Sequence, residues 1–599
     1  MNKEQIGWKT CMKGMGRFVS PYKGKLLVAV LTTVFATAIY SLNPTIEGLA
    51  TTQLARDASE ILQGVSGAHV HFDKVFRILA LLGTSYVTRA LALLVSAFFL
   101  TNAIQQTMHD LRGALQKKIQ KMPVSYFDEH AFGDVLSCVT NDVDTLSNAL
   151  QQTLTRVISG VLTFILAVSM MLRINVAMTL IALIIIPLVA LITKVFVKRS
   201  QDLFDIQQKT VGQLNGAITE LYGGFNEIIS YNKQEDVEKQ FEEVNQKMRN
   251  SAFKAQFVSS LISPCVSLVT YLTIGTCAVI GCLQVIQGTI TIGQLQAFVR
   301  YIWQINDPLS QVSQLSAQVQ AAFSAMRRIF TLLAEKEEDQ GGKAEIAKDK
   351  IEGNVTFEHV QFGYDKELLM KDVNIDVKKG QTVAIVGPTG AGKTTLMNLL
   401  LRFYDVKGGS IKIDGVDIRD MKREDLRSLF SLVLQDTWLF SGSIYDNIRY
   451  GRQNARKDEI ISAAKMANVH HYIRTLSRGY DSLINEEANN ISQGEKQLLT
   501  IARAILKDPQ ILILDEATSS VDTRLERRLQ EAMLRVMEGR TSFVIAHRLS
   551  TIRDADMILV LRDGDIVEQG THEELLAKKG MYEKLYHSQF AGQNFDDVC

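Results

Sequence analysis

The sequence predicts a multidomain membrane protein: a six-helix α transmembrane domain followed by an α/β domain with a phosphate-binding loop (P-loop). Long apolar segments fill the first half, and near Gly353 short β-type runs begin to alternate with helical stretches. The glycine-rich run Gly387–Thr394 lies between a strand-like and a helix-like segment. A hydrophobic share of 46% beside 22% charged residues suits a membrane half joined to a soluble half.

Six segments are long and apolar enough to be membrane-spanning helices, since a bilayer core needs about 20 mostly apolar residues per helix. The third and fourth are separated only by Arg173–Asn175, which predicts a tight hairpin. An even number of spans places both termini on one side of the membrane. The predicted spans are Leu26–Ile46, Ile78–Leu100, Val157–Leu172, Ala177–Phe196, Leu261–Ile286 and Ile292–Leu315.

The distribution of lysine and arginine predicts the orientation. Basic residues crowd the stretch Lys3–Lys25 and the loops after spans two and four, whereas the connection between spans five and six has none. By the positive-inside rule the termini and the two long loops are cytoplasmic, and the expected location is the plasma membrane. The loops have helical periodicity, as in Gln207–Asn250, so we expect long helices that continue out of the bilayer.

Polar residues inside predicted spans are costly in lipid and therefore indicate a functional or paired role. Arg89 falls near the middle of span two, and span six carries one polar face at helical spacing, with Pro308 beside it. That face either lines a water-filled substrate cavity or pairs with its neighbours and with helix ends. Its residues are Arg300, Gln304, Asp307, Gln311 and Gln314.

Net charge and cysteines exclude two classes of function. A formal net charge of +1 gives no argument for nucleic-acid binding, and no such partner is expected. The six cysteines include no CxxC pair with zinc-like spacing, and Cys265, Cys277 and Cys282 lie in one apolar run. A thiolate metal site is therefore not predicted.

The strongest motif is Gly387–Thr394, which follows the strand-like Thr382–Val386 and opens a helix-like stretch. Backbone N–H groups of such a loop curl around phosphates, Lys393 supplies charge to the β- and γ-phosphates, and the Thr394 hydroxyl is placed for Mg²⁺. The residues expected to contact the phosphates are Gly387, Thr389, Gly390, Ala391, Gly392, Lys393, Thr394 and Thr395.

A second motif is the apolar strand Ile511–Leu514, which ends in Asp515 and Glu516. A buried strand that delivers one carboxylate to a metal ion and the next to an attacking water fits phosphoryl transfer. An exposed acidic strand end would also explain two acids. It would not explain their spacing from the phosphate loop and from His547.

Together these motifs resemble the nucleotide-binding domain of ABC transporters, and nearly the whole chain resembles a half-transporter of the exporter (type IV) fold. Ile491–Glu495 is similar to the family signature, and Ser520–Asp522 is similar to its D-loop. In the membrane half, Pro123–Asp128 and Asn141–Val143 resemble the first cytoplasmic loop. That loop and the stretch near Gly223–Phe225 would hold the coupling helices that touch the ATPase domains.

The resemblance implies ATP and Mg²⁺ as cofactors and assigns a role to each matching residue. Tyr364 would stack on adenine, Glu516 would activate the attacking water, and His547 would contact the γ-phosphate. The implied catalytic residues are Glu516 and His547, the metal ligands are Thr394, Gln435 and Asp515, and the further nucleotide contacts are Tyr364, Gln435, Ser492, Gly494 and Glu495.

The resemblance also implies a dimer, because in the family each ATP lies between the Walker residues of one ATPase domain and the signature of the other. Here Gln493 replaces the first glycine of the usual signature and Glu495 replaces its final glutamine. A carboxylate near the partner's phosphates would weaken that site unless a cation offsets it. An intact Walker set with an altered signature resembles one member of heterodimeric exporters, so a heterodimer is slightly favoured over a homodimer.

The expected organisation is a cytoplasmic segment at 1–25, the transmembrane domain at 26–322, a linker at 323–352, the ATPase domain at 353–590 and a tail at 591–599. The function implied is ATP-driven export of a hydrophobic or amphiphilic compound by alternating access, with a small molecule, lipid or peptide as cargo. The alternatives are a siderophore-type importer with the same fold and an ATP-gated regulator or channel.

Overall fold

The computed structural model describes residues 7–342, 351–435, 437–485, 488, 490–515, 523–546 and 549–590, without the side chains at 307–317, 523, 550 and 588–590. The chain divides into two compact units, which we describe separately. The helical unit comprises Met1–Lys121 and His130–Lys336. The α/β unit comprises Met122–Glu129 and Glu337–Cys599.

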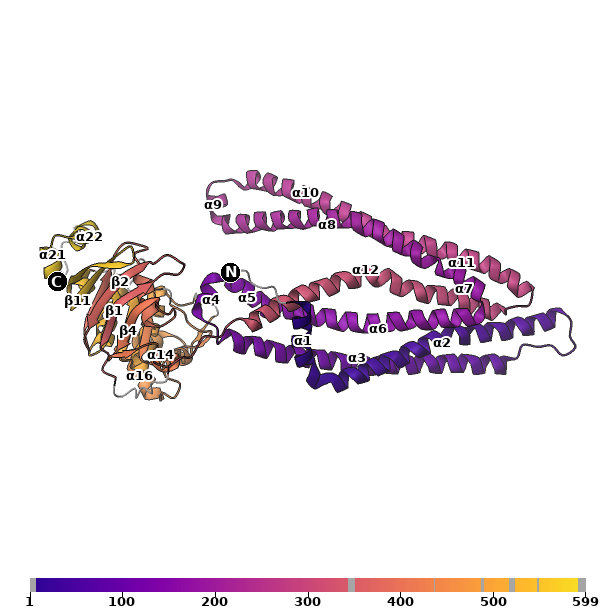
Figure 1. The fold of residues 1–599 in the computed structure, drawn as a ribbon, viewed down its shortest axis with the longest axis horizontal. Helices are drawn as coiled ribbons and strands as arrows, with labels where there is room; N and C mark the ends of the chain where they lie inside the picture. The colour runs from indigo at the N-terminus through magenta and orange to yellow at the C-terminus, as the bar shows by residue number, and fades with distance from the viewer. Residues whose placement is uncertain are drawn as a thin grey trace. The chain divides into compact units, whose positions relative to one another are not determined.

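Long α-helices build the helical unit. They are α1 (Trp8–Val19), α2 (Lys23–Leu62), α3 (Phe72–Ile119), α5 (Phe132–Ser137), α6 (Val143–Ile174), α7 (Val176–Leu183), α8 (Ile185–Gly223), α9 (Phe225–Ser230), α10 (Gln234–Ser260), α11 (Ile262–Ile286) and α12 (Ile292–Ala334), with the short turns η1 (Ser20–Tyr22) and η2 (Cys138–Asp142). Helices α2, α3, α6 and α12 pack side by side, and α8 pairs with α10 and α11 (Figure 1).

Five described helical segments are long and apolar enough to cross a membrane, and their most apolar windows are only 6–33% buried. Most of this apolar surface therefore faces outward, as lipid contact requires. The segments are Trp8–Leu62, Phe72–Ile119, Phe132–Ile174, Val176–Gly223 and Gln234–Ile286. The sixth predicted span, Ile292–Leu315, lies in α12, where the side chains of residues 307–317 are outside the described part. A count of six stays a prediction.

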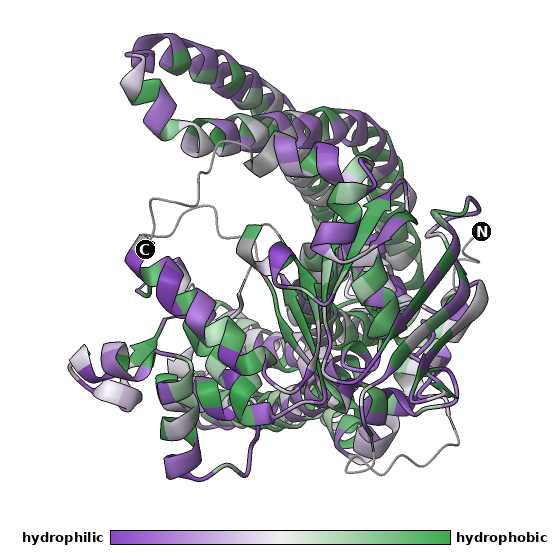
Figure 2. Ribbon diagram, turned by 90° about the vertical axis from the view of Figure 1, so that its left-hand side faces the viewer, coloured by the Kyte–Doolittle hydropathy of each residue, from purple (hydrophilic) through white to green (hydrophobic). Residues whose placement is uncertain are grey.

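Two local predictions for the helical unit are confirmed. The hairpin between spans three and four is a single residue, Asn175, whose side chain accepts a hydrogen bond from the Met178 N–H and so begins α7. The stretch Gln207–Asn250 is helical in α8, α9 and α10, with turns between them. In Figure 2 the end of this hairpin, at the top, is mostly hydrophilic, which suits a part that lies outside a bilayer.

Side chains of α12 donate hydrogen bonds to α2 near Pro44, the residue that interrupts the backbone hydrogen bonding of α2. Proline has no N–H, so the Tyr40 carbonyl four residues earlier loses its helical donor. The Gln304 side-chain amide donates to that carbonyl instead, at 3.2 Å. The Tyr301 hydroxyl donates to the next carbonyl, that of Ser41, at 3.0 Å. A polar residue inside the predicted sixth span therefore has a structural role.

The α/β unit is built on two main sheets. Its strands are β1 (Val355–Phe362), β2 (Met370–Val377), β3 (Thr382–Val386), β4 (Gly408–Ile413), β5 (Val416–Asp417), β6 (Phe430–Val433), β7 (Gly442–Ser443), β8 (Leu483–Ile484), β9 (Ile511–Asp515), β10 (Thr541–Ile545), β11 (Met557–Arg562) and β12 (Asp565–Gly570). The order β12-β11-β3-β10-β9-β6 is parallel except for β12, and β2-β1-β4-β5 is antiparallel. The predicted, largely parallel sheet is confirmed.

Helices cover the parallel sheet, and alternate residues of its strands enter two different hydrophobic cores. In β9, Ile511 and Ile513 belong to one core, and Leu512 and Leu514 belong to the other. The helices of this unit are α4 (Val124–Glu129), α13 (Lys393–Leu400), α14 (Arg423–Ser428), α15 (Ile444–Arg449), α16 (Lys457–Met466), α17 (His470–Thr475), α18 (Gln493–Lys507), α19 (Thr523–Met537), α20 (Leu549–Arg553), α21 (His572–Ala577) and α22 (Met581–Phe590), with the short turn η4 (Gly479–Asp481).

Candidate nucleotide site

The predicted phosphate loop connects strand β3 to helix α13. Two of its glycines are required by the backbone: Gly392 has φ +97°, and a Cβ on Gly387 would lie 2.4 Å from the Leu561 carbonyl oxygen. Ala391 is buried and anchors the loop, because its carbonyl accepts from the Gly564 N–H at 3.1 Å. Thr389, Gly390 and Thr394 are exposed, and Thr395 is buried at the start of α13. The loop therefore leads directly into the N-terminus of a helix, a place where anions bind favourably.

Lys393 lies within the curve of this loop. Its ammonium group donates to the carbonyls of Gly387 at 2.7 Å and Pro388 at 3.1 Å. Burial lowers the pKa of Lys393, and the charge of Asp515 opposes that shift. A lowered lysine pKa means that burial makes this positive charge less favourable than it is in water. A bound polyphosphate would compensate the charge.

We therefore expect Lys393→Met to abolish the rise in unfolding temperature that MgATP causes, with only a small change in the unfolding temperature of the nucleotide-free protein. The nucleotide-free protein loses two hydrogen bonds but also the cost of burying a charge, whereas the nucleotide-bound protein loses the cation that compensates the phosphates. Thermal unfolding with and without MgATP measures both effects. Lys412→Met, on strand β4 of the same unit, is the matched control and should keep the nucleotide-dependent rise. A rise in Lys393→Met equal to that of the unmodified chain would contradict the assignment.

Asp515 reaches the same edge of the sheet from strand β9. Strand β10 lies between β9 and β3, and its Ile545 is level with both Asp515 and Ile385. Adjacent strands are about 4.8 Å apart, so Asp515 starts roughly 10 Å from the strand that enters the phosphate loop. Its charge acts on Lys393 across this gap. The structure thus brings together the lysine and the predicted metal-binding carboxylate.

The predicted signature begins helix α18, and Gln435 follows strand β6. The Gln493 side-chain amide donates to the backbone carbonyl of Gln435 at 3.5 Å, so these two segments lie together. Ser492 is the N-cap of α18 and is exposed, whereas Gly494 is buried. The exposed N-terminus of a helix is again a place where an anion binds favourably.

Glu495 is held within its own helix end. Its carboxylate accepts hydrogen bonds from the backbone N–H of Ser492, at 3.3 Å, and from the Ser492 hydroxyl, which completes a capping box. Burial raises the pKa of Tyr472 to about 12, with a smaller contribution from the negative charge of Glu495. The Tyr472 phenol also donates a hydrogen bond to this carboxylate. These donors offset part of the negative charge that makes the signature unusual. The S-x-x-E spacing was visible in the sequence, whereas the Tyr472 contact was not.

Tyr364, the predicted adenine-stacking residue, has a side chain open to a ligand. It is 54% exposed, and its hydroxyl lies 3.1 Å from the Thr395 hydroxyl at the start of α13. The ring packs against Phe362 and Tyr404 with centroid distances of 5.1 Å and 5.0 Å. A supported ring with a free face is what base stacking needs. Glu516, His547 and the D-loop residues Ser520–Asp522 lie outside the described residues, so their roles stay predictions.

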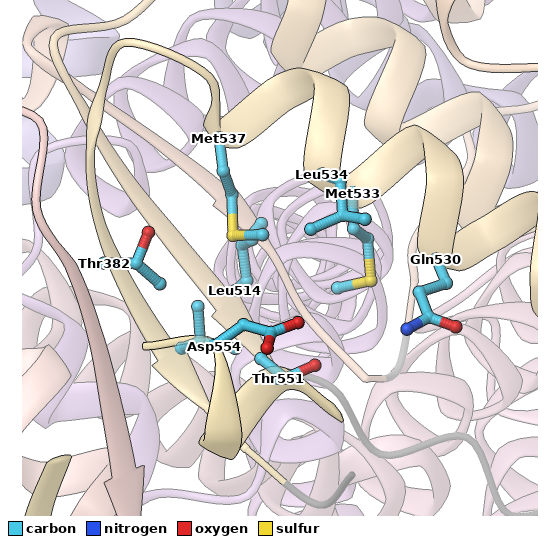
Figure 3. Close-up of a pocket in the computed structure, with 9 residues that line it drawn as sticks. Thr382, Leu514, Gln530, Met533, Leu534, Met537, Thr551 and Asp554 are labelled. Carbon is cyan, nitrogen blue, oxygen red and sulfur yellow. The ribbon is translucent and has the colours of Figure 1, made fainter. Parts of the chain in front are cut away.

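A small cavity in this unit is separate from the phosphate loop. Its volume is about 60 Å³, well below the several hundred Å³ of a typical ligand pocket. Met533, Leu534 and Met537 of α19 form one wall, and Asp554 and Thr551 lie on the opposite side (Figure 3). Its lining, which includes Leu514 and Val544, is mostly apolar. The cavity contains no residue predicted to contact the nucleotide.

A second polar cluster lies in the helical unit, around Arg89. The Arg89 guanidinium lies over the Tyr40 ring, 4.1 Å from its centroid. Nearby, Glu47 pairs with Arg300 at 3.4 Å and accepts from the Tyr86 hydroxyl at 2.9 Å. Within the described residues Arg89 has no carboxylate partner. On the predicted polar face, Arg300 is therefore paired. The alternative of a water-filled cavity stays a prediction. Glu47, Tyr40 and Tyr86 belong to no sequence motif and were not predicted as site residues. Asp307, Gln311 and Gln314 lie outside the described side chains.

Comparisons with known proteins find two matching family models. The model described as the ABC transporter transmembrane region matches residues 26–309, and the model described as ABC transporter matches residues 370–519. The second range includes the phosphate loop, the signature and Asp515.

Several curated proteins are similar over most of their length. A "Fatty acid ABC transporter ATP-binding/permease protein" of Mycobacterium bovis is 44% identical over 531 residues, which cover 88% of this chain and 84% of that protein. The "Uncharacterized ABC transporter ATP-binding protein YfiC" of Bacillus subtilis is 38% identical over 97% of this chain and 94% of its own. An "ATP-dependent lipid A-core flippase" of Syntrophus aciditrophicus is 35% identical over 81% of each chain.

Proposed function

Because this chain belongs to the ABC transporter family, in which ATP drives transport, we propose that it is one half of an exporter for an anionic amphiphile. The observation that carries the proposal is the combination in one chain of an outward-facing apolar helical unit and a phosphate-loop unit. We further propose that the helical unit spans the plasma membrane and that both termini and the α/β unit are cytoplasmic. Several apolar helices and the lysine and arginine distribution support this location.

The proposed mechanism is alternating access driven by ATP. Lys393 and the loop N–H groups bind the phosphates, and Tyr364 stacks on adenine. Oxygen ligands suit Mg²⁺, so the Thr394 hydroxyl, the Gln435 amide and the Asp515 carboxylate would hold this ion, which neutralises phosphate charge when bound. Glu516 takes a proton from the attacking water, and His547 stabilises the charge that develops on the γ-phosphate. ATP binding closes two α/β units, and hydrolysis lets them separate.

A second half-transporter is the proposed partner. Exposed apolar side chains gather around α9, at the tip of the α8–α10 hairpin: Tyr222 is 78% exposed, Phe225 56% and Tyr231 77%. These are two tyrosines and one phenylalanine on a mostly hydrophilic tip (Figure 2), and exposed aromatic side chains of this kind favour a protein contact. We slightly favour a heterodimer over a homodimer, because Gln493 and Glu495 alter the signature that would complete the partner's ATP site.

The proposed substrate class follows from the charge on Arg89. Among the described residues, Arg89 is a cation without a carboxylate partner inside a predicted span, which favours an anionic ligand. Outward-facing apolar helices favour a lipid-like one. The printed names of two relatives, a fatty acid transporter and a lipid A-core flippase, agree with this class. Export is proposed, with siderophore-type import and an ATP-gated channel or regulator as the alternatives.

The test is transport in inside-out membrane vesicles with radiolabelled oleate as the probe. We expect ATP-dependent accumulation that Lys393→Met abolishes. ATP-dependent loss of preloaded oleate would indicate import, and a flux that persists without hydrolysis would indicate a channel. The same assay with the chain expressed alone and with a neighbouring half-transporter gene distinguishes a homodimer from a heterodimer. Full ATP hydrolysis and transport by the chain alone would remove the argument for a heterodimer.

A further inference from the structure

Four residues immediately after the phosphate-loop helix α13 connect several parts of the α/β unit. We call Arg402–Asp405 the junction segment. The chain leaves α13 at Arg402, whose φ is +52°, and the side chains of the segment then point to different partners. Arg402 is 5% exposed and donates to Asp405 at 2.8 Å. The segment is therefore fixed in place directly behind the helix that the phosphates contact.

Tyr404 of the junction segment connects the predicted adenine site to helix α4. Its ring is perpendicular to the Tyr364 ring, with centroids 5.0 Å apart, and also packs on Phe362. Its hydroxyl donates to the Asp128 carboxylate at the end of α4. Burial and this hydrogen bond raise the pKa of Tyr404 well above its usual value, so the phenol keeps the proton that it donates. One side chain thus contacts both Tyr364 and Asp128.

The same junction segment holds the connection that leaves α12. Arg423 is 5% exposed and donates to the Asp405 carboxylate at 2.8 Å and to the Asp339 carbonyl at 2.8 Å. Arg427 donates to both oxygens of the buried Glu338 carboxylate, at 2.8 and 2.6 Å. The α/β unit is connected along the chain to the helical unit at α4 and at Glu337–Gly342. Both of these stretches are therefore anchored at or beside the junction segment.

We propose that Tyr404 is a positioning residue that couples nucleotide binding at Tyr364 to the position of Asp128 and helix α4. A base stacked on the free face of Tyr364 would restrict that ring. Because the Tyr404 ring packs perpendicular to the Tyr364 ring and the Tyr404 hydroxyl is bonded to Asp128, the restriction reaches α4 through two contacts. Coupling of this kind is reciprocal, so the position of α4 also affects nucleotide affinity. The inference rests on the proposed function, since it assumes that ATP drives a change in the helical unit.

The test compares Tyr404→Phe, Asp128→Ala and the double variant. Tyr404→Phe keeps the ring that supports Tyr364 and removes only the hydroxyl. Tyr582→Phe is the matched control, because its hydroxyl also makes one hydrogen bond, to His572 at 2.7 Å, elsewhere in the α/β unit. In the assembled transporter, spin labels at Ser66→Cys and Thr289→Cys, in a background without native cysteines, report the distance between the α2–α3 and α11–α12 connections before and after trapping with MgATP and vanadate.

We expect Tyr404→Phe and Asp128→Ala each to lower, by about fivefold or more, the fraction of molecules in which the label distance changes. Basal ATP hydrolysis at saturating MgATP should be retained. The double variant should be no worse than either single variant, because both remove one interaction. Tyr582→Phe should behave as the unmodified chain does. An unchanged distance response in Tyr404→Phe, additive losses in the double variant, or loss of ATP hydrolysis in Tyr404→Phe would each overturn the inference. If the unmodified chain hydrolysed ATP without any distance change, the alternating-access proposal itself would fail.

Discussion

Replacing Glu516 with glutamine is expected to stop ATP turnover while leaving ATP binding intact. Glu516 directly follows Asp515 at the carboxyl end of β9, the edge of the sheet at which β3 enters the phosphate loop. Glutamine has the same shape but cannot accept the proton of the attacking water. Because a positioned general base contributes about 10²–10⁴-fold, the rate of hydrolysis should fall by at least about 100-fold.

Two measurements distinguish a lost base from a damaged site. ATP hydrolysis gives the loss of rate, and the rise in unfolding temperature with MgATP shows that binding persists. Glu538→Gln, at an exposed position just after α19, removes a carboxylate of the same unit and should leave both quantities unchanged. Hydrolysis at the normal rate in Glu516→Gln would remove Glu516 as the base. Loss of the thermal response would instead indicate a structural role.

Short-range features of this chain could be predicted from sequence because their causes are local. The phosphate loop depends on glycines at fixed spacing between a strand and a helix, and the structure has β3 and α13 at these positions. The parallel sheet follows from apolar runs such as Ile511–Leu514, which are buried on both faces. The single-residue hairpin at Asn175 follows from a polar residue between two apolar stretches that can cap the second helix.

Contacts between distant residues could not be predicted in the same way. Tyr404 and Asp128 are 276 positions apart, and neither lies in a spacing pattern that identifies the other. The Arg300–Glu47 pair depends on how α12 packs against α2, which is set by shape rather than by local sequence. Whether a charged residue in a span is paired can therefore be decided only once the packing of the helices is known. Among the described residues, Arg300 has a carboxylate partner and Arg89 has none, a difference that the sequence alone could not show.

That difference leads to a prediction about substrate recognition at Arg89. Arg89→Ala should raise the oleate concentration needed for half-maximal stimulation of ATP hydrolysis about 10- to 100-fold. The reason is that a hydrogen bond to a charged group is worth about 1.5–3 kcal/mol. Stimulation by methyl oleate, which has the same chain without the charge, should not change. The concentration for Arg89→Lys should lie between those of the unmodified chain and Arg89→Ala, because lysine keeps the charge but loses the planar stacking on Tyr40.

The control for this experiment is on the same helix. Arg77→Ala removes an exposed arginine of α3 that precedes the predicted span, and it should leave both probes unaffected. Basal ATP hydrolysis without oleate should be equal in all three variants, because Arg89 belongs to the helical unit and contacts no nucleotide. Equal losses for oleate and methyl oleate in Arg89→Ala would mean that the arginine supports the Tyr40 contact and helix packing. Selective loss of the oleate response would mean that the arginine recognises the carboxylate, since only the negative charge distinguishes the two probes.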